Sequence, residues 1–343
     1  MTLNQRWHLE WHHGSLAVYA TGGMLGNVEF KHAGRLVRPF YEVPWLADAE
    51  AAGAQGLVAH MRSEFPCVPF GVPYRANQVD EAWHAALTTS AAQYDPAMDA
   101  SDDLLHGYGA IGEWTLVSQS ASEIRIAIDY PTSSAISRLT RVIRADLAAP
   151  AIDFELHIEA RRTSARPLGL HPNIALPSLT GALRIDPGAF AFGMVHPGGP
   201  EPGVSRARAG AQFSRLDNVP LGAGGHAAFD RLPLADDTEE ILQLCGMDGS
   251  VTMIDEVADV AYRLTWDAAV LPSLLLWISN RGRRYAPWNG RNLCVGVEPI
   301  AGAFELGCQA SLAANPINAQ GVATAVTLDP EAPVTLAYRF EVC

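Results

Sequence analysis

Cysteine is scarce in this sequence, and long apolar runs are missing. Five cysteines are spread over 343 residues, and none of them forms a Cys-x-x-Cys pair. A disulfide framework or a zinc knuckle is therefore not expected, and a reducing compartment fits the cysteine usage best. No stretch reaches the roughly 18 uncharged apolar residues that can span a bilayer. The opening MTLNQRWHLEWHHG also lacks the apolar segment of a signal peptide. We expect a cytoplasmic protein with no membrane partner.

Positive charge is also in short supply, with 24 Lys and Arg against 37 Asp and Glu and a net charge of −13. Such a chain repels phosphate backbones, so no nucleic-acid partner is expected. The sequence has no phosphate-binding G-x-x-x-x-G-K-[ST], no G-x-S-x-G elbow and no H-E-x-x-H. The histidines of WHLEWHHG (His8, His12 and His13) have no matching carboxylate pattern. We therefore expect no nucleotide or nicotinamide cofactor and no metal.

Alternation of apolar and polar residues is the dominant pattern. It is clearest in EIRIAIDY (residues 123–130) and AIDFELHIE (residues 151–159), where one face would be buried and the other solvated. Similar segments lie early, at SLAVYAT and NVEFKHA, and late, at SVTMIDE, VAYRLTWD, SLLLWISN, LCVGVEPI and VTLAYRFEV. Short links favour antiparallel neighbours. The fold class predicted is all-β, a large antiparallel β-sandwich forming one domain over residues 1–343.

Evidence for helices is thin. Residues 47–55 are rich in alanine but short, and residues 236–244 would allow one or two helical turns. Residues 186–234 carry many glycines and prolines and show little periodicity. We expect long loops there that cross the rim of a sheet.

Three titratable residues stand at strand ends among turn-forming neighbours. These are His106 in LLHGYGAIGEW, His171 in PLGLHPNIALP and Glu298 in LCVGVEPI. A carboxylate that ends an apolar strand is often partly desolvated, which raises its pKa and suits it to proton transfer. The alternative for Glu298 is a structural role as a cap or an ion-pair partner.

A fourth segment, FPCVPFGVPYRANQ (residues 65–78), mixes aromatic residues and prolines with Arg75 and Asn77. A guanidinium and an amide held on a rigid loop suit a ligand rich in hydroxyl groups. A packed surface loop is the equal alternative. Aromatic residues such as Trp114, Phe70 or Trp288 would offer a flat apolar face to a ligand, or else belong to the core.

These segments resemble the aldose 1-epimerase family, which includes galactose mutarotases and hexose-phosphate mutarotases. PYRANQ resembles the family's Gly-Arg-x-Ala-Asn-Arg, with Arg75 and Asn77 in matching places. LHGYGAIGEW resembles its His-Gly-Gly…Trp segment and places His106 at the first family histidine. GLHPNIALP places His171 at the second, and CVGVEPI places Glu298 at the catalytic carboxylate. The resemblance implies the galactose mutarotase-like supersandwich.

The resemblance also implies a reaction and a set of roles. Glu298 would be the base and His171 the acid that open a sugar ring and exchange roles on closure, with His106 near the ring oxygen. The substrate would be a small-molecule sugar, and no cofactor or metal would be needed. The expected substrate-binding residues are Arg75, Asn77, Trp114 and Asn173.

Departures from the family pattern leave the natural sugar open. Gln78 stands for an arginine, Tyr108 for a glycine, and Pro172 with Asn173 for the usual residues after the histidine. The family's sugar-contacting aspartate has no clear counterpart, and Asp217 is only a guess.

Two other functions stay in play: a non-catalytic carbohydrate-binding protein of the same fold, and a different reaction on an acidic sugar. Guanidinium suits carboxylate or phosphate. The reaction on an acidic sugar is suggested by the arginines of RGRRYAPWNGR, which are Arg281, Arg283, Arg284 and Arg291.

Overall fold

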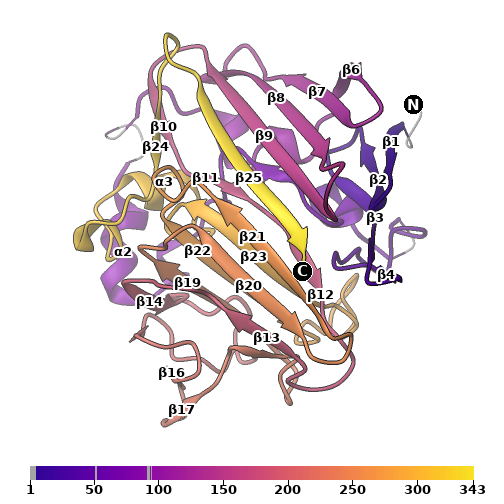
Figure 1. The fold of residues 1–343 in the computed structure, drawn as a ribbon. Helices are drawn as coiled ribbons and strands as arrows, with labels where there is room; N and C mark the ends of the chain where they lie inside the picture. The colour runs from indigo at the N-terminus through magenta and orange to yellow at the C-terminus, as the bar shows by residue number, and fades with distance from the viewer. Residues whose placement is uncertain (1–4, 51, 91–92, 94) are drawn as a thin grey trace.

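The computed structural model describes residues 5–50, 52–90, 93 and 95–343. Antiparallel strands make up most of this part of the chain and confirm the predicted all-β class (Figure 1). The larger sheet has nine strands. In spatial order they are β18 (Arg231–Leu232), β13 (Leu183–Asp186), β20 (Ser250–Asp255), β21 (Val260–Trp266), β25 (Val334–Val342), β9 (Ala151–Ala160), β8 (Ile136–Ala145), β7 (Glu123–Asp129) and β6 (Thr115–Gln119).

The second large sheet has eight strands and carries the site described below. Its order is β15 (Gln212–Phe213), β14 (Phe192–Val195), β19 (Thr238–Cys245), β22 (Ser273–Asn280), β23 (Leu293–Ala301), β11 (Leu168–Leu170) and β5 (Pro66–Cys67), with β12 (Asn173–Ala175) also pairing with β23. Strands β19 and β22 are buried along their whole length, because they lie in the middle of this sheet.

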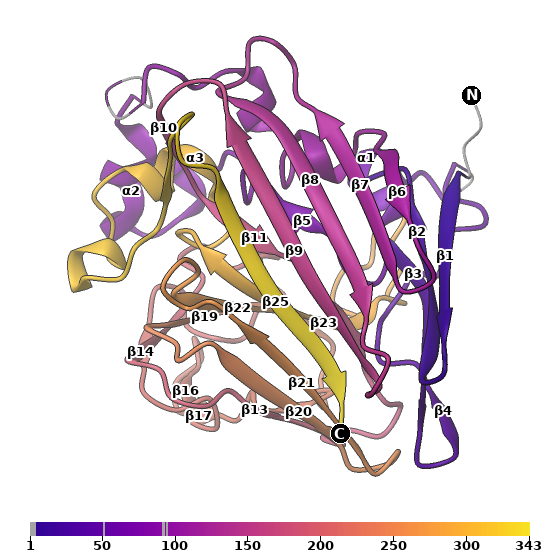
Figure 2. The ribbon, with the colours of Figure 1, turned by 45° about the horizontal axis from the view of Figure 1, so that its top comes forward.

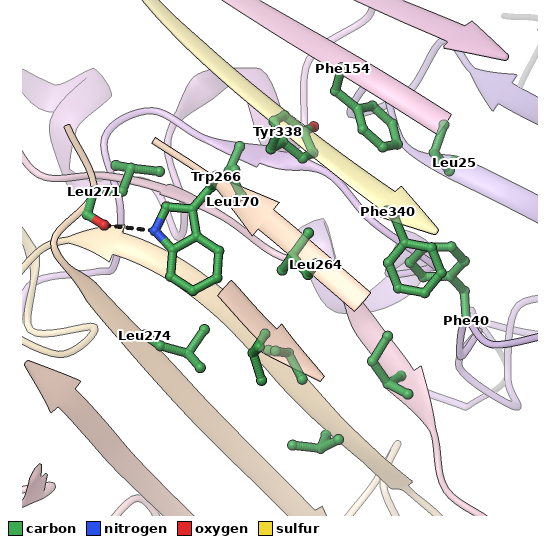
Figure 3. Close-up of a cluster of buried hydrophobic side chains, with 14 of the residues drawn as sticks. Leu25, Phe40, Phe154, Leu170, Leu264, Trp266, Leu271, Leu274, Tyr338 and Phe340 are labelled. Carbon is green, nitrogen blue, oxygen red and sulfur yellow. Dashed lines mark hydrogen bonds between the residues drawn. The ribbon is translucent and has the colours of Figure 1, made fainter. Parts of the chain in front are cut away.

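The two sheets pack face to face around an apolar core. Trp266 and Leu264 of β21 lie opposite Leu274 of β22 and Leu170 of β11 in Figure 3, and all four are buried. The indole nitrogen Nε1 of Trp266 donates a hydrogen bond to the carbonyl of Leu271 at 2.8 Å. The one polar atom of this large side chain is thus satisfied inside the core.

A smaller sheet covers one edge of the nine-stranded sheet. It contains β1 (Arg6–Trp11), β2 (Gly14–Tyr19), β3 (Leu25–His32) and β4 (Arg35–Val37). Figure 2 shows it beside β6 and β7, and the Gln119 side chain donates to the carbonyl of His8 at 2.8 Å. Two-stranded pairings join β10 (Ser164–Arg166) to β24 (Val326–Leu328) and β16 (Val219–Pro220) to β17 (His226–Ala227).

A buried ion pair connects distant parts of the chain. Glu64 and Arg141 form a salt bridge with almost no exposed side-chain surface. The Tyr338 hydroxyl donates to Glu64 Oε1 at 2.8 Å, and Arg141 also donates to the carbonyl of Gly23. These contacts pair the two buried charges, as the low-dielectric interior requires, although Arg141 Nε has no hydrogen-bond partner among the described residues.

The helices differ most from expectation. Residues 236–244 were predicted to allow helical turns, and this was wrong, because Thr238–Cys245 forms β19. Residues 47–50 and 52–53 form turns and bends, and α1 (Gly56–His60) begins shortly after them. Two further helices, α2 (Glu81–Thr88) and α3 (Gly307–Leu312), were not predicted. Asp80 caps α2 by accepting from the Ala82 amide at 3.0 Å.

Residues 186–234 run mainly as loops with short strands, in line with the expectation. No helix in the described ranges has the length and apolarity needed to cross a membrane.

Candidate active site

Glu298 lies on β23, in the middle of the eight-stranded sheet, and only 1% of its surface is exposed. Gly296 stands two residues earlier and faces the same side, because side chains in a strand alternate between faces. A Cβ atom at Gly296 would lie 2.3 Å from Glu298 Oε1. The glycine therefore leaves the space that the carboxyl group occupies.

His171 lies between β11 and β12, where the chain crosses beside β23. Its Nε2 is 3.4 Å from Glu298 Oε1. The ring stacks on Phe65 at a centroid distance of 4.6 Å, and the His171 amide donates to the Phe65 carbonyl at 2.9 Å. Asn173 is fully buried, and its Nδ2 donates to the carbonyl oxygens of His171 and Ser63 at 3.3 and 3.4 Å. Asn173 thus holds the backbone that presents the imidazole.

His106 comes from a loop with a positive φ of 57°, and its ring centroid is 5.0 Å from that of His171. The His106 amide donates to the Gly71 carbonyl at 2.9 Å, and the Gly71 amide donates to His106 Nδ1 at 3.4 Å. Because Nδ1 accepts a hydrogen bond, the neutral ring carries its proton on Nε2. Gly71 has a φ of +90°, and a Cβ there would lie 2.6 Å from the Glu305 carbonyl oxygen, so only glycine fits this crossing.

These three side chains line one cavity of about 220 Å³. That is smaller than the ~300–1,000 Å³ pockets of drug-sized ligands, so the cavity suits a single small molecule. The other lining residues include apolar side chains, two tryptophans and two more charged groups. They are Leu57, Val58, Met61, Val72, Tyr74, Leu105, Pro200, Ile241, Leu275, Trp277, Arg283, Trp288 and Glu305.

Burial shifts the pKa values of all three groups toward their uncharged forms. Desolvation raises the pKa of Glu298 well above 4.5, and the charge of Glu305 raises it further. Desolvation lowers the pKa of His171 well below 6.5, with His106 adding to the effect. The pKa of His106 falls to about 4 through burial. Burial therefore favours the state in which Glu298 is a carboxylic acid and His171 a neutral imidazole, so that the pair carries one proton.

The structure also brings in residues that the sequence reasoning missed. Glu305 lies in the turn after β23 and lines the cavity. His196 Nε2 is 3.1 Å from Glu305 Oε1, and the His196 side chain is fully buried. The only sequence signal was a carboxylate among small residues in IAGAFELG, seven positions after Glu298. His196 lies in residues 186–234, where the sequence shows little periodicity and no motif that would have indicated a functional residue.

The four expected substrate-binding residues do not line this cavity. Arg75 and Asn77 are exposed, next to and within a 3₁₀ turn at Ala76–Gln78. Trp114 is 2% exposed, and its Nε1 donates to the Gly109 carbonyl at 2.8 Å. Asn173 acts through the His171 backbone, as described above. Their assignment as sugar contacts stays a prediction without geometric support.

Other sequence candidates are scattered. Among the arginines of RGRRYAPWNGR, Arg283 lines the cavity, whereas Arg281 and Arg284 pair with Asp237. Arg291 lies over Trp45 instead, at 5.5 Å from the ring centroid. Asp217 pairs with Arg215, away from the cavity. In the ranges that the structure describes, no group of three His, Cys, Asp or Glu side chains could hold a metal ion.

Comparison with solved structures shows that the chain has the galactose mutarotase-like fold. It superposes on an Escherichia coli K12 protein provisionally named an aldose 1-epimerase, with a TM-score of 0.62 and 15% identity, covering 99% of both chains. A galactose mutarotase-like protein from Clostridium acetobutylicum gives a TM-score of 0.61 at 9% identity, covering 99% of this chain and 95% of that one.

A third similar structure is the Slr1438 protein of Synechocystis sp. PCC 6803, with a TM-score of 0.64 and 12% identity over 99% of this chain and 96% of that one. No protein-family model and no curated protein sequence matches the chain. At these identities the likeness establishes the fold, and the chemistry must be argued from the cavity itself.

Proposed function

We propose that this protein is an aldose 1-epimerase, which interconverts the α and β anomers of a hexose or hexose derivative. The observation that carries the proposal is the Glu298–His171 pair, 3.4 Å apart, on the wall of a cavity sized for one small molecule. The anomeric hydroxyl and the ring oxygen of a pyranose are bonded to the same carbon. An acid and a base that serve both oxygens must therefore lie close together, as these two groups do.

The reaction begins when the shared proton moves from Glu298 to His171, which creates a carboxylate and an imidazolium without uptake of a proton. Glu298 then removes the proton of the anomeric hydroxyl while the bond between C1 and the ring oxygen breaks. His171 delivers its proton to that oxygen. The open aldehyde rotates about C1–C2, and closure from the other face returns both protons with the roles exchanged.

The remaining lining groups have roles that suit this chemistry. The Nε2–H of neutral His106 is a hydrogen-bond donor for a sugar oxygen, because its Nδ1 already accepts from Gly71. Trp277 and Trp288 offer flat apolar surfaces for the faces of a sugar ring. The low-polarity surroundings strengthen every charge interaction that develops during ring opening.

Anomer exchange measured by two-dimensional exchange NMR or polarimetry on freshly dissolved sugars tests the proposal. Wild-type protein should accelerate exchange of at least one free hexose or hexose phosphate. Glu298→Gln keeps the shape of the side chain but cannot act as a base, so the rate should fall by about 10²- to 10⁴-fold.

Glu331→Gln is a matched control, since it makes the same substitution at an exposed residue that does not line the cavity. It should retain the wild-type rate. Sugar binding without acceleration of any sugar in the panel would reject the enzyme and favour a carbohydrate-binding protein of this fold.

A further inference from the structure

Glu305 and His196 form a second buried acid–imidazole pair in which the proton position is defined. The Gly198 amide donates to His196 Nδ1 at 3.1 Å, so this nitrogen is an acceptor. The ring proton therefore lies on Nε2, which is 3.1 Å from Glu305 Oε1. His196 Nε2 thus faces one oxygen of the Glu305 carboxylate at contact distance, without the geometry of a hydrogen bond.

The other oxygen of Glu305 is free. Oε2 is buried and has no hydrogen-bond partner among the described residues, although Glu305 lines the cavity. Burial has the largest effect on the pKa of Glu305 and raises it, but the combined interactions with His196, the Glu305 backbone and His106 make the net shift downward. A buried, ionised oxygen without a donor is costly, and a donor from a ligand would remove that cost.

The charge of Glu305 is only partly offset at the cavity. The one permanent cation among the described lining residues is Arg283. Its Nε lies 3.4 Å from Glu201 Oε2 without a hydrogen bond, and its guanidinium lies over the Trp288 ring at 4.7 Å. The Tyr285 hydroxyl donates to Glu201 at 3.1 Å. Arg283 therefore stands between two acids, Glu201 and Glu305, and the formal charge of the three groups together is negative.

We propose that Glu305 selects the substrate: its free oxygen accepts a hydrogen bond from a sugar hydroxyl, and its charge excludes phosphorylated and carboxylated sugars. The substrate class is then neutral aldoses. This inference rests on the proposed function, because it takes a sugar as the ligand of this cavity. It also decides against the acidic-sugar reaction that the arginines of residues 281–291 suggested.

The test compares neutral probes, D-glucose and D-galactose, with anionic probes, D-glucose 6-phosphate and D-glucuronate. Both anomer exchange and binding, the latter by ligand-observed NMR, are measured for wild type and Glu305→Gln. Wild type should prefer the neutral probes in both measurements. Glu305→Gln should lose about 10- to 150-fold in kcat/KM for the preferred neutral sugar, which is the effect of removing a charged hydrogen bond, and should lose its discrimination against the anions.

Glu331→Gln serves again as the exposed control and should leave the selectivity unchanged. A wild-type preference for either anionic probe overturns the inference, as does unchanged neutral-sugar kinetics in a folded Glu305→Gln variant. If no probe exchanges faster, the proposed function fails by itself. The binding measurements still decide whether neutral sugars are preferred, and they need no variant to fold.

Discussion

The space beside Glu298 gives the sharpest test of the site. In a Gly296→Ala variant the new methyl carbon would lie 2.3 Å from Glu298 Oε1, whereas an ordinary contact is 3.4 Å or more. The carboxyl oxygen must therefore move by about 1.1 Å, because it is the flexible end of the side chain and the strand backbone is fixed on both sides. A displacement of about 1 Å can reduce a rate ~10²-fold. We expect a loss of that order in anomer exchange.

Stability should change little in the same variant. Alanine is favoured over glycine in a strand by roughly 0.5–1 kcal/mol, which offsets part of the local crowding. Gly222→Ala is the matched control, since a Cβ there has its nearest neighbour at 3.7 Å. Combined with Glu298→Gln, the Gly296 change should add almost no further loss, because it acts through the same carboxyl group. A folded Gly296→Ala protein with the wild-type rate would refute the placement of Glu298 as the base.

Three further outcomes follow from the structure. The rate of anomer exchange should be independent of pH where Glu298 and His171 share one proton. It should fall at a pH below 6.5, where the pair gains a second proton because the pKa of His171 is lowered, and at high pH, where the pair loses its proton at the raised pKa of Glu298. A pH–rate profile that rises toward acid contradicts this. Arg141→Met should destabilise by about 3–5 kcal/mol in urea unfolding, because Glu64 is left buried and unpaired, and adding Glu64→Gln should restore much of the loss. Trp114→Phe should lower the melting temperature but not raise the KM for any sugar, since Trp114 packs in the core; a raised KM would restore it as a sugar contact.

Much of the fold was readable because its strands bury one face. The period of two in β7 and β9 reappears in their burial patterns. The same reasoning failed at β19, where one or two helical turns were expected over residues 236–244. This strand carries two successive acids, Glu239 and Glu240. Both are buried: Glu240 Oε1 accepts from the Thr238 hydroxyl at 2.6 Å, and Glu239 Oε1 accepts from the Ser279 hydroxyl at 2.8 Å. Local polarity cannot reveal a partner that another strand supplies, as β22 supplies Ser279 to Glu239.

The site was predictable to a similar degree. Glu298, His171 and His106 were found because each was expected to end a strand or stand in a turn, and the resemblance ordered them along the chain. For Glu298 this expectation was wrong, because β23 continues past Pro299 to Ala301 and Glu298 lies inside the strand. Glu305 and His196 meet across the fold from segments with no local pattern, so spacing gave no hint of their 3.1 Å contact. Conversely, Trp114 is of a residue type that often stacks on sugars, but its indole is buried in the core and donates its one hydrogen bond to the Gly109 carbonyl.

The backbone at Gly71 and Val72 is hydrogen-bonded to two sides of the cavity, the turn that carries Glu305 and the loop that carries His106. Val72 donates its amide to the Glu305 carbonyl at 2.9 Å, while the Gly71 carbonyl accepts from the His106 amide at the same distance. A ligand that draws Glu305 inward therefore pulls on the strip of backbone that carries the His106 loop. The linkage consists of two main-chain hydrogen bonds, so side-chain substitutions would leave it in place.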